Sequence, residues 1–260
     1  ISIKRDGDLI WCEKRSNLQR LWARTSFEIQ SLRDNPECAR EEFEKINDSD
    51  AGLSANLTFD LEEDVSAPFL VGSVTRPKIA VLREQGVNGQ LEMAAAFDRA
   101  GFTSVDVHMS DLKAGRFDLS DFKGMVACGG FSYGDVLGAG QGWAKGILFN
   151  ESIREMFSRF FEREDSFTLG VCNGCQMLSG LKDLIPGASS WPSFVRNRSE
   201  QFESRLSLVR IENNPSVFFM NMAGSHMPIA VAHGEGRVEF SDVEKQESVN
   251  SQSLVSLRYI

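Results

Sequence analysis

The stretch that most constrains the fold is residues 170–176, Gly-Val-Cys-Asn-Gly-Cys-Gln, because it joins two segments of opposite character. The apolar residues Ser166 to Leu169 before it are typical of a short buried strand, and the residues from Met177 onward are typical of a helix. A chain that passes from strand to helix within so few residues must turn sharply, which is the basic step of an α/β fold. The sequence therefore predicts a strand, a tight turn and a helix around Cys172.

The glycines that flank this turn indicate a reactive cysteine. Gly170 and Gly174 stand two residues before and two residues after Cys172, where small residues relieve the crowding around a strained backbone. Gly-x-Cys-x-Gly is the thiol counterpart of the nucleophile elbow. It places the sulfur at a helix N-terminus, where the helix dipole and unpaired N–H groups favour a thiolate. We therefore expect Cys172 to act as a nucleophile.

The pair formed by Cys172 and Cys175 also has two other interpretations, a redox dithiol and one half of a zinc site. Zinc needs four ligands, and the other cysteines, at positions 12, 38 and 128, form no second pair, so the sequence predicts no metal site. A redox dithiol would need a small domain built around the motif. Inside the expected helix, Cys175 is better explained as a packing residue.

Composition limits the class of protein and its partners. A chain of 260 residues that is 42% hydrophobic can form one large domain or two modest ones. Its net charge of −9, without a basic cluster, argues against a nucleic-acid or membrane partner. No apolar run approaches the roughly 20 residues that span a bilayer. The five unevenly spaced cysteines fit a reducing compartment, so we expect a cytoplasmic protein. Because the first residue is Ile and residues 256–260 resemble a strand, we also expect a piece of a longer polypeptide.

Three regions differ in pattern along the chain. Residues 1–46 predict a hairpin around Asp6-Gly7 and then one helix, whose apolar face we expect to dock on a preceding domain. Residues 47–76 have the polar, acidic composition of a linker, in which Leu57 to Leu61 can lie extended along a surface. Residues 77–260 predict a doubly wound, mostly parallel sheet with its sites at the carboxyl ends of the strands. The expected strands are 79–82, 105–109, 124–127, 166–169, 206–211 and 228–232, and the expected helices include 91–100 and a long one at 143–161.

Acyl transfer by a thiol also needs an oxyanion hole and a base. The backbone N–H of Asn173, which follows the nucleophile, is one expected oxyanion donor, and the loop Gly129-Gly130-Phe131 is placed to supply the second. An ordinary tight turn would explain the glycine pair equally well. His233 is followed by Glu235 and is a candidate base with an orienting carboxylate, although a loop contact to substrate or to another domain fits as well.

Four sequence blocks carry a family resemblance: residues 83–88, Arg-Glu-Gln-Gly-Val-Asn; residues 129–135, Gly-Gly-Phe-Ser-Tyr-Gly-Asp; residues 170–176; and residues 232–237, Ala-His-Gly-Glu-Gly-Arg. From about residue 77 to residue 260, the chain resembles the class I, triad-type glutamine amidotransferase domain of the formylglycinamide ribonucleotide amidotransferase family, which has a flavodoxin-like fold. Residues 32–39 and 67–69 resemble the end of the synthetase portion in its large, single-chain form.

The resemblance implies that glutamine is hydrolysed through a thioester on Cys172, with Gly130 and Asn173 in the oxyanion hole and Gln176 holding the glutamine. It further implies a ligase in which the released ammonia passes to a synthetase domain of the same polypeptide. That domain would use ATP and Mg²⁺ to convert formylglycinamide ribonucleotide to the amidine in purine biosynthesis. No cofactor is expected on the present segment.

One departure from the family matters for catalysis. The family takes its catalytic His and Glu from a His-Pro-Glu motif near the C-terminus, and these 260 residues contain none. His233 and Glu235 match a different block, so we expect them in the active-site wall or in an interdomain contact. We therefore expect a glutaminase domain truncated at its C-terminus and inactive alone. Two alternatives stay open: a non-catalytic docking or allosteric module, and a cysteine hydrolase of the same fold, which would have no need of Gln176 or of residues 83–86.

Overall fold

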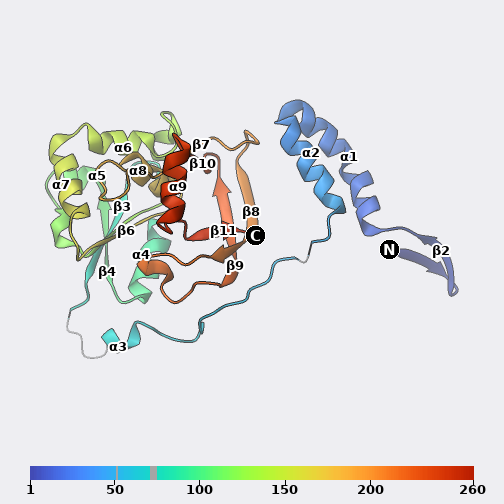
Figure 1. The fold of residues 1–260 in the computed structure, drawn as a ribbon, viewed down its shortest axis with the longest axis horizontal. Coiled ribbons are helices and arrows are strands. Elements are labelled where there is room, and N and C mark those ends of the chain that lie inside the picture. The colour runs from blue at the N-terminus through green and yellow to red at the C-terminus, as the bar shows by residue number, and fades with distance from the viewer. Residues whose placement is uncertain (51, 71–74) are drawn as a thin grey trace.

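The computed structural model describes residues 1–50, 52–70 and 75–260. Figure 1 shows an α/β body, with an N-terminal hairpin and two helices standing to one side of it. Part of the predicted linker, residues 47–76, lies outside the described residues. The division at residues 46 and 76 stays a prediction. Within the described part of the chain, no helix is long and apolar enough to cross a membrane.

A parallel sheet of four strands forms the centre of the α/β body, in the order β4-β3-β5-β6. The residues from Ile79 to Leu82 in β3, and Met125 to Ala127 in β5, are completely buried. Helices cover both faces of such a sheet, which is why its strands are continuous apolar runs rather than alternating ones. The sheet confirms the doubly wound α/β class. Its strands are β3 (Lys78–Arg83), β4 (Thr103–His108), β5 (Gly124–Ala127) and β6 (Phe167–Gly170).

Two apolar clusters attach helices to the two faces of this sheet. On one face Ala80 and Leu82 pack with Trp143 and Phe157, and on the other Val81 packs with Phe97. The first face is covered by α5 (Met109–Lys113), α6 (Gln141–Leu148), α7 (Glu151–Phe161) and α8 (Asn173–Gly180), and the second by α4 (Gln90–Arg99).

The predicted single helix at 143–161 is wrong, because α6 ends at Leu148 and α7 begins at Glu151. The side chain of Asn150 accepts a hydrogen bond from the N–H of Ile153 and caps the second helix. An asparagine in the middle of a helical pattern is an N-cap signal. It starts a new helix here, although the apolar spacing continues across it.

A second, antiparallel sheet has the strand order β11-β8-β9, and a short pair joins β7 to β10. The strands predicted at 206–211 and 228–232 are present but longer, and β9 runs to His233, at the start of the 233–236 turn. These elements are β7 (Ser193–Val195), β8 (Glu203–Ile211), β9 (His226–His233), β10 (Arg237–Glu239), α9 (Val243–Ser251) and β11 (Leu257–Tyr259). Single turns of helix lie at Lys45–Asn47, Ala67–Leu70, Leu119–Asp121, Ser132–Asp135 and Val217–Phe219.

The N-terminal hairpin is confirmed as β1 (Ser2–Arg5) and β2 (Asp8–Cys12). The one helix expected after it is α1 (Arg15–Arg33), but a second, α2 (Pro36–Glu44), follows at once. The side chain of Asn35 caps α2 and Pro36 fills its first position, so the pair that ends α1 also begins α2. No residue of α1 is buried. Its apolar face is open, with Leu32 91% exposed.

The extended segment before the α/β body lies along the antiparallel sheet, as the sequence predicts for residues 57–61. Asn56 pairs with His226 at the start of β9. Thr58 follows it and donates its N–H to the Ser225 hydroxyl at 3.0 Å.

Candidate active site

The chain places its functional segments at one edge of the parallel sheet, where its strands end. Cys172 follows β6, residues 129–135 follow β5, and Glu84 follows β3. In a doubly wound sheet, ligands bind outside the carboxyl ends of the strands, near the point where the strand order reverses. That point lies between β3 and β5 in this order.

Cys172 has the backbone of a nucleophile elbow. It caps the start of α8 with φ 50° and ψ −111°, angles that are costly for a residue with a side chain. The two flanking positions need glycine, because a side chain at either one would collide with neighbouring atoms. A Cβ on Gly174 would lie 2.0 Å from the carbonyl oxygen of Ala127, and one on Gly170 would lie 2.7 Å from Leu178. The side chain of Cys172 is nevertheless exposed.

The loop after β5 is held beside the cysteine by the loop after β3. The N–H of Phe131 donates to the carbonyl oxygen of Gly86, and the N–H of Asn88 donates to that of Gly129, both at 2.9 Å. Gly130 has φ 143°, and a Cβ there would lie 2.6 Å from the Cα of Val87. This close approach explains the glycine pair better than an ordinary tight turn does.

Some backbone N–H groups of this region donate hydrogen bonds within the protein, and others do not. The N–H of Phe131 is used within the loop. Among the residues that the structure describes, the N–H groups of Gly130 and Asn173 donate no hydrogen bond. These are the two N–H groups predicted to form the oxyanion hole, and they remain available to a substrate.

The side chain of Asn173 ties α8 to the loop after β5. It is fully buried, its Oδ1 accepts from the N–H of Ser132 at 3.3 Å, and its Nδ2 donates to Asp135 at 3.0 Å. Burial raises the pKa of Asp135, and the charge of Glu235 adds to the rise, although the hydrogen bond from Asn173 opposes it.

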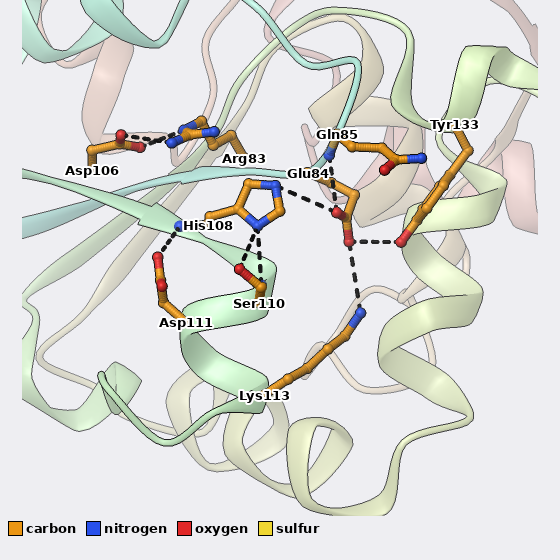
Figure 2. A network of polar contacts seen from close by, with 9 residues as sticks. All are labelled: Arg83, Glu84, Gln85, Asp106, His108, Ser110, Asp111, Lys113 and Tyr133. Atoms are coloured by element: carbon orange, nitrogen blue, oxygen red, sulfur yellow. Dashed lines mark hydrogen bonds and ion pairs between the residues drawn. The ribbon is translucent and has the colours of Figure 1, made fainter.

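A buried carboxylate, Glu84, anchors the other side of this loop (Figure 2). One of its oxygens accepts from the Tyr133 hydroxyl at 2.7 Å. The Nε2 of His108 lies 3.7 Å and the Nζ of Lys113 3.8 Å from the carboxylate. Burial and the hydrogen bond to Glu84 raise the pKa of Tyr133 to about 12. The network joins the ends of β3 and β4 to the loop that carries Gly130, and it gives His108 a structural role.

A cavity of about 180 Å³ opens beside the sulfur. The structure brings together around it most of the residues that the sequence singled out: Gly130, Phe131, Cys172, Gln176, His233 and Glu235. Gly129 lies just behind, since a Cβ on it would be 3.3 Å from that of Cys172. The sulfur itself lies 3.7 Å from the carbonyl oxygen of Ala232.

The far wall of the cavity is a network that ends on His233 and Glu235. The side-chain amide of Gln176 donates to the carbonyl oxygen of Glu235. The carboxylate of Glu235 accepts from the N–H of Ala139 at 2.8 Å. The Nδ1 of His233 lies 2.9 Å from Oδ1 of Asn197. His233 and Glu235 are therefore engaged separately within the wall, and neither orients the other.

The sequence analysis missed Asn197 and Asp135 as parts of this site. The available signal for Asn197 was an amide side chain two residues after a short strand, β7, which ends at Val195. Cys175, in contrast, behaves as a packing residue, because burial raises the pKa of its thiol to about 11. Cys172 and Cys175 are both free thiols.

The elbow can be tested by comparing two glycines of neighbouring helices. Gly174→Ala drives a methyl group into the backbone of Ala127, and we expect it to lower the free energy of unfolding by about 1–3 kcal/mol. Gly146→Ala in α6 meets nothing closer than 3.9 Å, so we expect it to be neutral or to stabilise by up to about 1 kcal/mol. Urea denaturation of both variants measures the difference. Equal stabilities would show that α8 is not tightly apposed to β5.

Comparison with known proteins agrees with this geometry. Residues 76–260 match the model of the CobB/CobQ-like glutamine amidotransferase domain. A solved structure described as PurLQS from Thermotoga maritima is 25% identical, covers 72% of this chain and 76% of its own, and superposes with a TM-score of 0.55. The matched segment contains Cys172, the loop after β5 and the 232–237 block. The chain belongs to the CobB/CobQ-like glutamine amidotransferase family, and its α/β body is a glutamine amidotransferase domain similar to that of PurLQS.

Proposed function

We propose that Cys172 hydrolyses glutamine and that the ammonia serves a synthetase domain that makes formylglycinamidine ribonucleotide in purine biosynthesis. The observation that carries the first part is an exposed cysteine with φ 50° at the start of α8, beside two N–H groups, those of Gly130 and Asn173, that donate to no acceptor within the described part of the chain. Family membership supplies glutamine as the substrate. The resemblance of residues 32–39 and 67–69 to the end of a synthetase portion supports the second part.

The reaction divides into two covalent steps. The thiolate of Cys172 attacks the side-chain amide carbon of glutamine, and the N–H groups of Gly130 and Asn173 stabilise the oxyanion. The carbon–nitrogen bond then breaks, the nitrogen takes up a proton and leaves as ammonia, and a thioester remains. Water attacks the thioester, glutamate leaves, and the thiol is restored.

The roles of the cavity wall follow from this chemistry. Gln176 would orient the bound glutamine, although its side-chain amide already donates to the Glu235 carbonyl. The proton transfers need a base, and the resemblance places it in a His-Pro-Glu motif that residues 1–260 lack. We assign His233 to the wall, because it lies in the 232–237 block, which in the resemblance is separate from the catalytic His-Pro-Glu motif.

The remaining parts of the proposal concern the whole enzyme. It would be a carbon–nitrogen ligase, with ATP and Mg²⁺ acting on the synthetase domain and not on this chain. Cysteine usage supports a cytoplasmic location. Neither a nucleic-acid nor a membrane partner is proposed.

The role of Cys172 is tested in the full-length polypeptide with 6-diazo-5-oxo-norleucine, a glutamine-analogue electrophile. We expect mass spectrometry to find the label on Cys172. Cys172→Ala should lower glutamine-dependent turnover by more than about 10³-fold, since it removes the nucleophile, and leave ammonia-dependent turnover within about twofold. Cys12→Ala, which removes another exposed thiol, is the matched control. An unlabelled Cys172 would favour a docking module, and hydrolysis of other acyl substrates but not glutamine would favour the hydrolase alternative.

Residues 1–260 alone should show no glutaminase activity, because their sequence lacks the His-Pro-Glu motif from which the resemblance takes the base. The measurement is glutamate release by the purified segment, with the full-length polypeptide as the positive control. Activity in the segment that disappears in His233→Ala would contradict this and make His233 the base.

A further inference from the structure

The loop of residues 197–202 contacts both the wall of the glutamine cavity and the N-terminal helix α2. Its first residue, Asn197, is only 5% exposed although it is polar. The side-chain Nδ2 of Asn197 donates to the carbonyl oxygens of His233 at 2.8 Å and of Gln201 at 3.0 Å. Its Oδ1 lies 2.9 Å from Nδ1 of His233 and accepts from the N–H of Gly236 at 3.3 Å. One buried amide thus fixes both the 197–201 turn and the 233–236 turn.

The 233–236 turn cannot shift without moving the cavity wall. Its Glu235 holds Gln176 through the carbonyl oxygen and Ala139 through the carboxylate. Gly236 packs directly against the ring of His233, because a Cβ on it would lie 2.3 Å from that ring. The hydrogen bonds of Asn197 therefore determine where this wall stands relative to Cys172.

The loop also forms part of the cavity itself. Glu200, Gln201 and Phe202 line the same cavity as Cys172. The ring of Phe202 lies 6.4 Å from that of Phe131, in the loop after β5. Glu200 has φ 60°, a conformation that the surrounding contacts must maintain.

Helix α2 and the end of α1 hold the outer side of this loop. Arg198 donates to Glu41 at 2.6 Å and to the sulfur of Cys38 at 3.3 Å. The side-chain amide of Gln201 donates to Asp34 at 3.0 Å. A cavity of about 320 Å³ lies between the two helices and the loop. Because this junction is loosely packed, the polar contacts rather than apolar burial set the position of the loop.

We propose that the 197–202 loop is a positioning element of the glutamine cavity, that Asn197 is its central positioning residue, and that α2 sets its position from outside. This inference rests on the proposed function, since it concerns capture of glutamine at the same cysteine. It assigns to the α1–α2 unit a direct mechanical connection to the cavity. A shift of these helices would then change glutamine capture without touching Cys172.

The inner contact is tested with Asn197→Ala and Asn197→Asp in the full-length polypeptide. Two rate constants for modification of Cys172 are measured, one with 6-diazo-5-oxo-norleucine and one with iodoacetamide, which needs only an accessible thiol. A wall misplaced by about 1 Å can cost up to about 100-fold, so we expect the first rate to fall by about 10- to 100-fold and the second to stay within about twofold. Asn197→Asp keeps the volume but turns a carboxylate oxygen toward two carbonyls, so it should be as impaired as Asn197→Ala.

The outer contact is tested with the double variant Asp34→Ala/Glu41→Ala, which changes neither a residue of the loop nor a residue that lines the glutamine cavity. Single polar contacts at a partly exposed junction are weak, so we expect the KM for glutamine to rise by about 2- to 5-fold while kcat stays unchanged. Glu28→Ala/Glu44→Ala removes the same charge from the exposed surface of the same helices and should leave both values unchanged.

The outcomes separate this inference from the proposed function. If the unsubstituted protein is not labelled by the glutamine analogue, the proposed function fails. If the unsubstituted protein is labelled, but the Asn197 variants and Asp34→Ala/Glu41→Ala are labelled at the same rate, the positioning role is wrong. If the Asn197 variants react more slowly by the same factor with both reagents, Asn197 only supports the fold. If Asp34→Ala/Glu41→Ala and Glu28→Ala/Glu44→Ala change the KM for glutamine equally, the role of α2 is overturned.

Discussion

The cysteine site depends on how closely helix α8 approaches strand β5. A methyl group on Gly174 would lie 2.0 Å from the backbone oxygen of Ala127, so only glycine allows this distance. Two residues earlier, Cys172 adopts its strained conformation, and a Cβ on Gly129 would lie 3.3 Å from the Cβ of Cys172. The buried side chain of Asn173 ties the helix to the loop that carries Gly130, through hydrogen bonds with Ser132 and Asp135. The close approach of α8 to β5 therefore helps to bring Cys172 together with the predicted oxyanion donors.

The sequence alone predicts those features of the fold that depend on a few neighbouring residues. The elbow could be predicted because Gly170, Cys172 and Gly174 lie within five residues, and the strands because buried parallel strands are continuous apolar runs. The break between α6 and α7 was missed because the apolar spacing continues through it, although Asn150 is an adequate cap. The second helix, α2, is not evident from Asn35-Pro36, because a pair that ends one helix gives no sign that it also caps and begins the next.

Features that depend on residues far apart in the sequence could not be found in this way. Asn197 meets His233 across 36 positions, and Glu84 meets Tyr133 across 49. The pair His233 and Glu235 shows the same limit. If both residues lay on a strand, their separation of two positions would place them on one face. Strand β9 ends at His233, however, and in the turn that follows the two side chains bind different partners.

One side of the resulting site is rigid, and its other side is a wall that is connected to residues outside the site. The elbow and the loop after β5 are held by backbone contacts and by buried Glu84 and Asn173. The wall at His233 and Glu235 is held through Asn197 by a loop that α2 also contacts. Such a division would let the chemistry stay fixed while capture of glutamine responds to another part of the polypeptide.

The most direct test of the account is a structure of the full-length polypeptide with a glutamine-derived acyl group on Cys172. We expect the acyl oxygen to lie about 3 Å from the backbone nitrogens of both Gly130 and Asn173. An acyl oxygen that points into solvent, away from these two N–H groups, would contradict it.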